Sequence, residues 1–247
     1  MKSILTSHLL GVTLALFPAF SICQGADRPA AGHVETERRL VELGGAKSVR
    51  VVVRMGAGEL NLTGGAKDLL NADFAYSRPS WRPDVVYEVS GGRGTLEIRE
   101  PEGVRDLPSS ERYVWNLRLN DDVPMELEVH LGVGKSELTL GWLTLRKLEV
   151  ETGVGECVVD LTGDWKRNLN ATVRGGIGKT TVRLPSDSGV LVRVIGGVGT
   201  VNHRGLRQMD GAFVNDLYGK SRITLEVDVR RGMGEVNLEV AKSPGVI

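Results

Sequence analysis

The sequence is poor in cysteine and in aromatic residues, and it carries no net charge. Its 247 residues include only two cysteines, Cys23 and Cys157, which excludes a disulfide framework and a cysteine-based metal site. The 31 basic side chains are balanced by 31 acidic ones, so the chain lacks the excess positive charge with which proteins attract nucleic acid. Helical patterns are also scarce, because valine, threonine and glycine dominate most segments. These features favour an all-β protein that does not bind nucleic acid.

Long hydrophobic runs are absent except at the start of the chain. Lys2 precedes an apolar run from Leu9 to Phe17, which is followed by a proline and small residues. This pattern is typical of a secretory signal peptide, and the run is too short to span a bilayer. We assign residues 1–26 to the signal peptide, with cleavage within 21–26, and predict an exported protein of the periplasm or cell surface without a transmembrane segment. A lipid anchor at Cys23 is the less favoured alternative, because Phe20 and Ile22 do not fit a lipobox.

Glycine, in contrast, is abundant and recurs in Gly-x-Gly units. The chain has 32 glycines, about twice the share of ~7% that is usual in proteins. Successive units are 36, 40, 21, 23, 21 and 35 residues apart, and the seven units begin at Gly56, Gly92, Gly132, Gly153, Gly176, Gly197 and Gly232. A period in the low twenties, interrupted by longer units, is typical of a solenoid.

Apolar and polar residues alternate on both sides of each unit. The positions five and three residues before the unit are apolar in all seven copies, as at Val51 and Val53. Apolar or small residues also recur after most units, as at Leu60 and Leu62. A period of two indicates half-buried strands, and the glycines between them allow the positive φ angles that a corner needs.

We therefore predict an all-β fold, a parallel β-solenoid of about seven coils. One coil cannot bury its apolar face alone, so successive coils stack in parallel and close the core, and crossover chirality favours a right-handed winding. The solenoid forms a single domain over 34–241. Its coils are irregular and carry insertions over 34–131, and they are regular over 132–241.

The segment RGGIGKTT, from Arg174 to Thr181, is similar to a phosphate-binding loop. Such a loop needs a helix after its lysine, whereas Lys179 is followed by TTVRLPSDSG, which is β-branched and then broken by Pro185. Units such as GGIGKT also match the glycines of a calcium-binding repeat, but Thr180 stands where that repeat has its aspartate. We therefore predict a solenoid corner here, with no cofactor and no metal.

Four other residues have side chains that could carry chemistry. Asp121 and Asp122 are adjacent, so on a strand they point to opposite faces, and before Pro124 they favour a turn. His203 stands at an inward position of its coil, which predicts a neutral core histidine or one at a frayed edge. Cys157 also stands at a core position, which predicts a buried apolar role. No G-x-S-x-G motif occurs, so we predict no catalytic site.

Aromatic residues and arginines gather in two segments before Gly132. They are FAYSRPSWRP, from Phe74 to Pro83, and RYVWNLR, from Arg112 to Arg118. Residues of these types anchor many interfaces, and the candidate interaction residues are Tyr76, Arg78, Trp81, Arg82, Tyr113 and Trp115. The alternative is that this region packs as a cap over the first open coil, which every solenoid needs.

Several segments, among them MGAGELNL, LEVETGVGECVVDLTGDW and YGKSRITLEVDV, resemble the bacterial toast-rack domain family. The resemblance runs from about residue 48 to residue 240. It implies an exported or membrane-attached β-solenoid for which no catalytic residues are established, related to a domain of LiaF-type cell-wall-antibiotic-response regulators. Those regulators carry transmembrane helices and this chain has none, so a membrane-embedded signalling role is not implied.

Together these patterns predict a non-catalytic, exported binding or scaffold module of the cell envelope, and the resemblance suggests a link to envelope stress response. The partner would be an envelope protein or a glycan. The alternative is a glycan-binding or glycan-cleaving β-helix protein. Two or more carboxylates that converge in a groove would favour that alternative, because glycosidases use a pair of them.

Overall fold

The computed structural model describes residues 34–102 and 111–241, which are mainly β-strand. One short 3-10 helix, η1 (Pro79–Trp81), occurs in these ranges, and no α-helix does. The predicted signal peptide and Cys23 lie outside the described residues. The strands are β1 (Glu35–Val41), β2 (Ser48–Ala66), β3 (Leu70–Tyr76), β4 (Asp84–Ser90), β5 (Arg93–Arg99), β6 (Tyr113–Asn120), β7 (Met125–Thr139), β8 (Leu145–Asp160), β9 (Leu169–Pro185), β10 (Gly189–Ile195), β11 (Val198–Arg204), β12 (Arg207–Met209), β13 (Ala212–Val214) and β14 (Thr224–Ala241).

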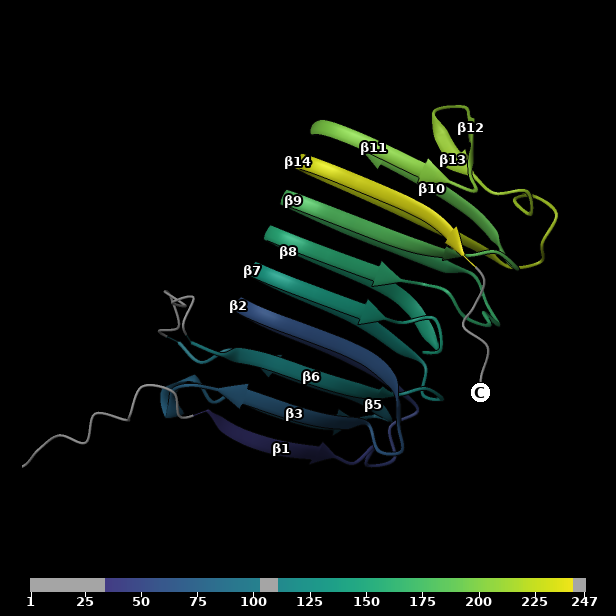
Figure 1. Cartoon of the computed structure of the whole chain (residues 1–247). Helices are drawn as coiled ribbons and strands as arrows, with labels where there is room; N and C mark the ends of the chain where they lie inside the picture. Colours follow the sequence, from purple (N-terminus) through teal and green to yellow (C-terminus); the bar gives the residue numbers. More distant parts are fainter. Residues whose placement is uncertain (1–33, 103–110, 242–247) are drawn as a thin grey trace, which may run out of the picture. The chain divides into compact units, whose positions relative to one another are not determined.

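All 14 strands belong to one open, mostly parallel sheet. Its five long strands, β2, β7, β8, β9 and β14, lie side by side in that order, as Figure 1 shows. The Gly-x-Gly units stay in register from strand to strand, since Gly134 of β7 pairs with Gly58 of β2 and with Gly155 of β8. This arrangement confirms the predicted all-β class and the parallel sheet.

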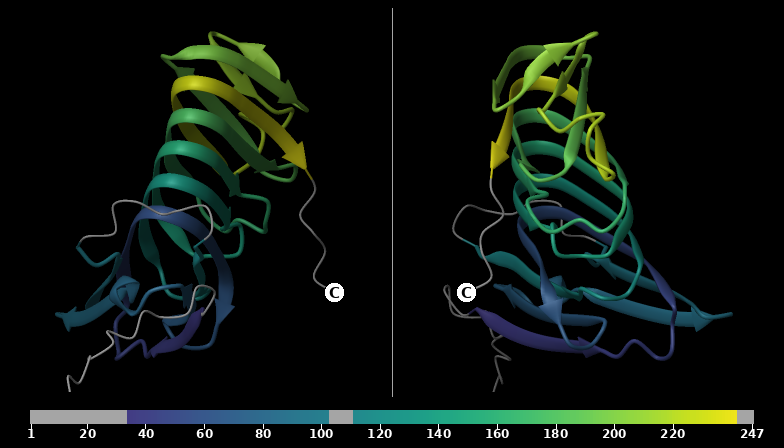
Figure 2. Two further views of the ribbon diagram at one scale, coloured as in Figure 1. Left: turned by 60° about the vertical axis from the view of Figure 1, so that its left-hand side comes forward. Right: turned by 90° about the vertical axis from the view of Figure 1, so that its right-hand side faces the viewer.

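Each long strand bends at its Gly-x-Gly unit, and the bends stack on one another (Figure 2). A Cβ atom on Gly155 would lie 1.9 Å from the carbonyl oxygen of Gly134, so neighbouring backbones leave no room for a side chain. The second glycine of each stacked unit also has a φ angle between 133° and 139°, which residues with a side chain rarely adopt; these glycines are Gly58, Gly134, Gly155, Gly178, Gly199 and Gly234.

The core lies between the two halves of each bent strand. We call the half before the bend its first leg and the half after the bend its second leg. In β8, Leu148 and Val150 before the bend and Cys157 and Val159 after it are at most 1% exposed, as the alternation predicts. The segments that link the long strands add further apolar side chains to the same core, namely Leu140, Leu143, Leu161 and Trp165. Alternate burial on both legs therefore encloses a continuous apolar interior.

The unit at Gly92 is not a corner of the stack. Gly91 and Gly92 have φ angles of 57° and 77° and form the two-residue turn of a hairpin in which β4 and β5 run antiparallel. Two consecutive residues with positive φ suit such a turn because its twist matches that of the strands. Six of the seven Gly-x-Gly units are therefore stacked bends, and the prediction that Gly92 begins a seventh is wrong.

β14, the last strand of the described residues, lies inside the sheet. β14 pairs in parallel with β9 on one side, with Val229 beside Val173, and with β10 and β11 on the other. The prediction that successive coils pair with each other is wrong at this point. After β9 the chain passes over one position in the sheet, forms β10 to β13, and returns to fill the vacant position with β14.

The bend of β2 is closed at its outer side by a carboxylate. β5 covers β2 up to Arg54 and β6 covers it from Glu59, so no strand of the described residues covers the bend between them on that side. An oxygen of Glu100 accepts hydrogen bonds there from the backbone N–H groups of Gly56 and Ala57, at 3.0 and 3.3 Å. The carboxylate thus replaces the carbonyl groups that a preceding strand would supply.

The last bend is closed by a cation. The carbonyl oxygen of each stacked glycine lies against the next strand in the sheet, and beyond β11 no next strand follows in the described residues. Arg231 of β14 donates hydrogen bonds to the carbonyl oxygens of Gly196 and Gly199, at 2.7 and 2.9 Å. The stack of bends therefore ends in an anion on its N–H side and a cation on its C=O side, as a capped helix does.

Candidate functional site

The predicted aromatic interaction residues lie in the core at the N-terminal end of the sheet. Tyr76 and Trp81 are 4% exposed, Tyr113 is 2% exposed and Trp115 is 0% exposed. Trp81 and Tyr113 have ring centroids 5.6 Å apart, and Tyr113 and Trp115 have theirs 5.7 Å apart. Tyr76 lies opposite Tyr113 in the pairing of β3 with β6. The structure thus brings these four side chains together by packing.

A contact surface, one of the two interpretations that the sequence allows, is therefore not formed by these four aromatic side chains. Large rings contribute most to stability when they are fully buried, and these occupy the inward positions of β3 and β6 or cover them from η1. The alternative interpretation, an insertion that packs as a cap, describes their placement.

The two predicted arginines remain at the surface. The side chain of Arg78 is 49% exposed and that of Arg82 is 55% exposed. The guanidinium of Arg78 lies 5.0 Å from the Trp81 ring centroid, while Arg82 donates two 2.7 Å hydrogen bonds to Glu37 of β1. The hydrogen bond from Arg82 holds the pKa of Glu37 below its usual value. Contact between these arginines and a partner stays a prediction.

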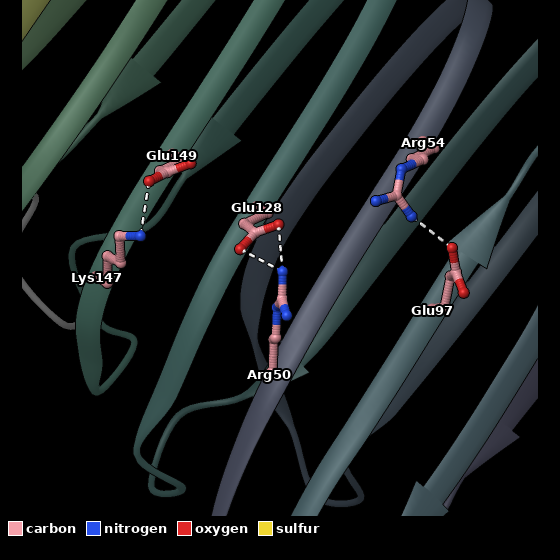
Figure 3. A network of polar contacts seen from close by, with 6 residues as sticks. All are labelled: Arg50, Arg54, Glu97, Glu128, Lys147 and Glu149. Atoms are coloured by element: carbon pink, nitrogen blue, oxygen red, sulfur yellow. Dashed lines mark hydrogen bonds and ion pairs between the residues drawn. The ribbon is translucent and has the colours of Figure 1, made fainter.

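The outward-facing charges of the first legs are largely paired. Figure 3 shows Arg50 of β2 with Glu128 of β7, at 2.9 and 3.0 Å, and Lys147 with Glu149 within β8, at 2.7 Å. The same view shows Arg54 paired with a glutamate of β5. A surface of neutralised pairs stays hydrated and offers a partner little to recognise.

The residue that follows the bend in each of the five long strands belongs to a second row, in which the charge alternates. In the order of the sheet, this row is Glu59, Lys135, Glu156, Lys179 and Glu235. Opposite charges therefore stand on neighbouring strands throughout, and the Lys135 ammonium lies 3.8 Å from Glu156. Lys179, the lysine of RGGIGKTT, stands between two glutamates on a continuous strand, so the helix that follows the lysine of a phosphate-binding loop is not formed here.

The middle residues of the stacked units form a row of exposed aliphatic side chains, which we call the crest. Its members lie in register along the bends, and five of them are 46–72% exposed: Val133, Val154, Ile177, Met233 and Val198. Contiguous exposed apolar residues commonly mark an interaction surface.

Sequence reasoning missed the crest, although a signal for it was present. The middle residue is aliphatic in all six stacked units, including Ala57 in the first, whereas the hairpin unit GRG has Arg93. The identity of this residue therefore separates the stacked bends from the hairpin turn.

A groove of about 790 Å³ lies beside the first bend. Its lining includes the carboxylates of Asp84, Glu100, Glu102 and Glu151. Two arginines, Arg54 and Arg99, and one histidine, His130, line the same groove. The groove is thus the place where several carboxylates converge, the feature that favours a glycan-directed role.

Three of these carboxylates already have partners within the protein. Asp84 lies 3.4 Å from Arg99, Glu151 lies 3.5 Å from His130, and Glu100 closes the bend of β2. Burial raises the pKa of Glu100, although its hydrogen bonds to the backbone N–H groups of the bend oppose this shift. A carboxyl group with a raised pKa can serve as a general acid, but a structural role accounts for all three contacts.

The acidic pair and Cys157 occupy structural positions. Asn120 accepts hydrogen bonds from the N–H groups of Asp122 and Val123, both at 3.0 Å, and Asp121 accepts one from Gly65 at 2.9 Å. The predicted turn is confirmed. Cys157 is 1% exposed, and burial raises the pKa of its thiol to about 11, so it is an apolar core residue.

His203 lies in β11, at the edge of the sheet. It is exposed, its ring centroid lies 4.8 Å from that of Phe213, and its Nδ1 atom lies 3.2 Å from the carbonyl oxygen of Leu206. Of its two predicted positions, the frayed edge is therefore the one observed. No group of three or more histidine, cysteine or acidic side chains within 34–102 and 111–241 could hold a metal ion. Within the same ranges, no helix has the length and apolarity needed to cross a bilayer.

A family model and one solved structure agree with this architecture. Residues 30–183 match the family model described as the N-terminal domain of toast_rack, DUF2154. A solved structure of a proposed cell adhesion protein from Clostridium sporogenes is 33% identical, covers 85% of this chain and 100% of its own, and has a TM-score of 0.81. A proposed adhesin from Bacteroides fragilis is 11% identical, with coverage of 84% and 98% and a TM-score of 0.35. A comparison with curated proteins finds no match. The chain therefore belongs to the toast-rack family.

Proposed function

We propose that the protein is a non-catalytic, exported binding or scaffold module of the cell envelope. The crest is the observation that carries this proposal. Its side chains point away from the core, so the fold would accept polar residues there, yet all are aliphatic. The name of the 33% identical structure, a proposed cell adhesion protein, supports a role in binding.

The crest has the geometry of a rigid contact surface. Six residues spaced by about 4.8 Å along the hydrogen-bonding direction of a sheet span roughly 24 Å. The glycines on either side are locked by the backbones of neighbouring strands, so the crest loses little conformational freedom when a partner binds. Each exposed aliphatic side chain that a partner covers contributes hydrophobic free energy.

The finer features predicted from the sequence belong to the same proposal. They are a right-handed solenoid winding, export by the signal peptide, and a link to envelope stress response. Arg78 and Arg82 are proposed as a secondary contact for an envelope protein or a glycan, because both guanidinium groups are exposed beside the cap.

Affinity capture tests the proposal. We expect the mature protein to retain a partner from its own envelope fraction, and the variant Val154→Ser with Ile177→Ser to lose most of it. The matched control is Val86→Ser with Val89→Ser, because these valines of β4 are exposed to a similar degree, 44% and 41%, and lie off the crest. Capture with and without intact peptidoglycan separates a protein partner from a glycan. Equal capture by both variants would refute the role of the crest.

A glycan-binding or glycan-cleaving role is a second candidate, and the carboxylates of the groove are the observation that favours it. Incubation with purified peptidoglycan fragments, followed by an assay for new reducing ends, tests cleavage. Release of reducing ends by the wild type that is lost in Glu100→Gln would make the protein an enzyme and refute the non-catalytic proposal. Retention of fragments without release would assign the groove to glycan binding.

A further inference from the structure

Four strands have one edge without a neighbouring strand in the described part of the chain. They are β1 and β12 at the two ends of the main path of the sheet, β4 beside β5, and β11 beside β14. An open edge presents unpaired backbone N–H and C=O groups that can pair with another strand, and proteins usually protect such edges with charges or keep them short.

Three of these edges are protected. β1 has four charged residues among seven, Glu35, Glu37, Arg38 and Arg39. β12 contains only three residues. β4 carries two acidic residues, Asp84 and Glu88.

The edge of β11 has less protection: Arg231 of β14 donates a hydrogen bond to the carbonyl oxygen of Gly199 near its start, and the strand itself carries few charges. Its seven residues, Val198 to Arg204, include no proline. Apart from His203, its only titratable side chain is that of Arg204, at its end, which lies 3.7 Å from Glu239 of β14. Six of the seven residues are exposed, and Val198 is 72% exposed.

The two legs of the sheet also end differently beyond β14. β10, on the first leg, is covered by β13, and Val192 at its inward face is fully buried. On the second leg, the side chain of Val201 of β11 faces the core, because Val201 pairs with the buried Val236 of β14. Val201 itself is only half-buried. A strand added along β11 would complete this wall of the core.

We propose that β11 pairs with β11 of a second copy of the chain. The two strands would run antiparallel about a twofold axis beside Val201, and the sheet would continue from one molecule into the other. Twofold dimers are the commonest homo-oligomers, and addition of a strand to an open edge is a general mode of recognition.

The sequence of β11 is compatible with pairing to itself. In the register centred on Val201, Thr200 lies opposite Asn202 of the partner subunit, and Gly199 lies opposite His203 of the partner subunit. Arg204 likewise lies opposite the partner's Val198. No two like charges therefore face each other, and each larger side chain meets a smaller or apolar one. The same test fails for β1, where Arg38 at the centre would face the partner's Arg38.

Two properties of the dimer follow from this geometry. Seven residues per strand make an interface below the usual size for stable complexes, so the dimer should form at high protein concentration and dissociate on dilution. The bend precedes Val198 in each copy, so antiparallel pairing places the two crests on opposite sides of the dimer. A dimer of this form could hold two partners at once, whichever molecule the crest binds.

Analytical ultracentrifugation over a wide concentration range tests the pairing. We expect the mature wild-type protein to dimerise and Val201→Lys to weaken the dimer at least tenfold, because an inward-pointing charge protects an edge. Val86→Lys, on the open edge of β4, is the matched control and should dimerise as the wild type does. A wild type that stays monomeric at all concentrations, or a control that also becomes monomeric, would overturn the proposal.

Cross-linking provides a second measurement that does not depend on the stability of Val201→Lys. In a Cys23→Ser background, Val201→Cys should form a disulfide-linked dimer on mild oxidation, since directly opposed residues have Cβ atoms about 5 Å apart. Thr200→Cys should cross-link much less. In this register the two residues at position 200 are not directly opposed but lie diagonally across the strand pair, where their Cβ atoms are farther apart. The buried Cys157 should not interfere. Equal cross-linking at both positions, or none at Val201→Cys, would exclude the proposed register.

Discussion

The central strands and the N-terminal end of the sheet build their cores from different side chains. In β7, β8 and β9 the inward positions hold leucine, valine and small residues that recur at equal positions from strand to strand, such as Val129, Val150 and Val173. At the N-terminal end, Phe74, Trp81 and Trp115 fill the interior with large rings instead.

The difference shows that two kinds of constraint shape one sheet. In the centre, each backbone packs against the next so closely that glycine is required at the bend. At the N-terminal end, no bend precedes that of β2 within residues 34–102 and 111–241, and individual side chains, the aromatic cluster and Glu100, close the structure. The centre therefore depends on repeated backbone geometry, and the end depends on particular side chains.

The largest effect should come from a charge in the central core. Val150→Asp places an ion at a position that is 0% exposed, with no partner to compensate it, and should cost about 5 kcal/mol or more of the free energy of unfolding. Urea denaturation measures this loss. The control Val154→Asp makes the same change on the crest of the same strand, where 46% of the side chain is exposed, and should cost less than about 1 kcal/mol.

The next largest effect should come from a methyl group at a stacked bend. Gly155→Ala combines a φ angle of 135° with a contact of 1.9 Å to a neighbouring carbonyl oxygen, and should cost about 4 kcal/mol. Gly91→Ala also adds a methyl group at a positive φ angle, but in open space, and should cost only about 1 kcal/mol. Thermal and urea denaturation measure both losses of stability. If Gly155→Ala and Gly91→Ala lose the same free energy of unfolding, then the positive φ angle alone, and not the close contact with the neighbouring strand, makes glycine necessary at the stacked bends.

At the N-terminal end, removal of a ring should destabilise the cap. Trp81 is 4% exposed, so Trp81→Ala should cost about 3 kcal/mol and melt well below the wild type. Trp142, which is 38% exposed, provides the control, and Trp142→Ala should cost less than about 1 kcal/mol. If Trp81→Ala melts with the wild type and loses partner binding, Trp81 belongs to an interface after all.

The smallest effect concerns Glu100 and depends on pH. Its pKa in the folded protein is raised above the ordinary value of 4.5, so the folded state binds a proton more tightly than the unfolded state does. Its contribution to stability is therefore greatest at acid pH and falls as the pH rises from 4.5 through the folded pKa. Glu100→Gln keeps an acceptor for the bend and should lack this fall, so the stability difference between variant and wild type should grow with pH. A constant difference in urea titrations across this range would contradict the raised pKa.

The alternation of residues was enough to predict the class of fold and the inward register of the central strands. It could not predict that β14 enters between β9 and β10, because every bend presents a similar pattern to its neighbours. The charges after the bends indicate the order of the strands in the sheet, because Glu156, Lys179 and Glu235 alternate in sign along it. In the sequence, the bend that precedes Thr200 stands between those of Lys179 and Glu235. The sequence does not decide between a contact surface and a cap for the aromatic cluster, because a list of aromatic residues does not say which face of a strand they occupy.

The position of β14 has a consequence in time as well as in space. β10 and β11 are joined to the rest of the sheet through β14 alone, and β12 and β13 are joined to it through β10. β14 also follows all four of these strands in the sequence, so it is synthesised after them. β10 to β13 therefore cannot join the sheet until synthesis has passed β14, and until then they must wait without the neighbour that connects them to β9.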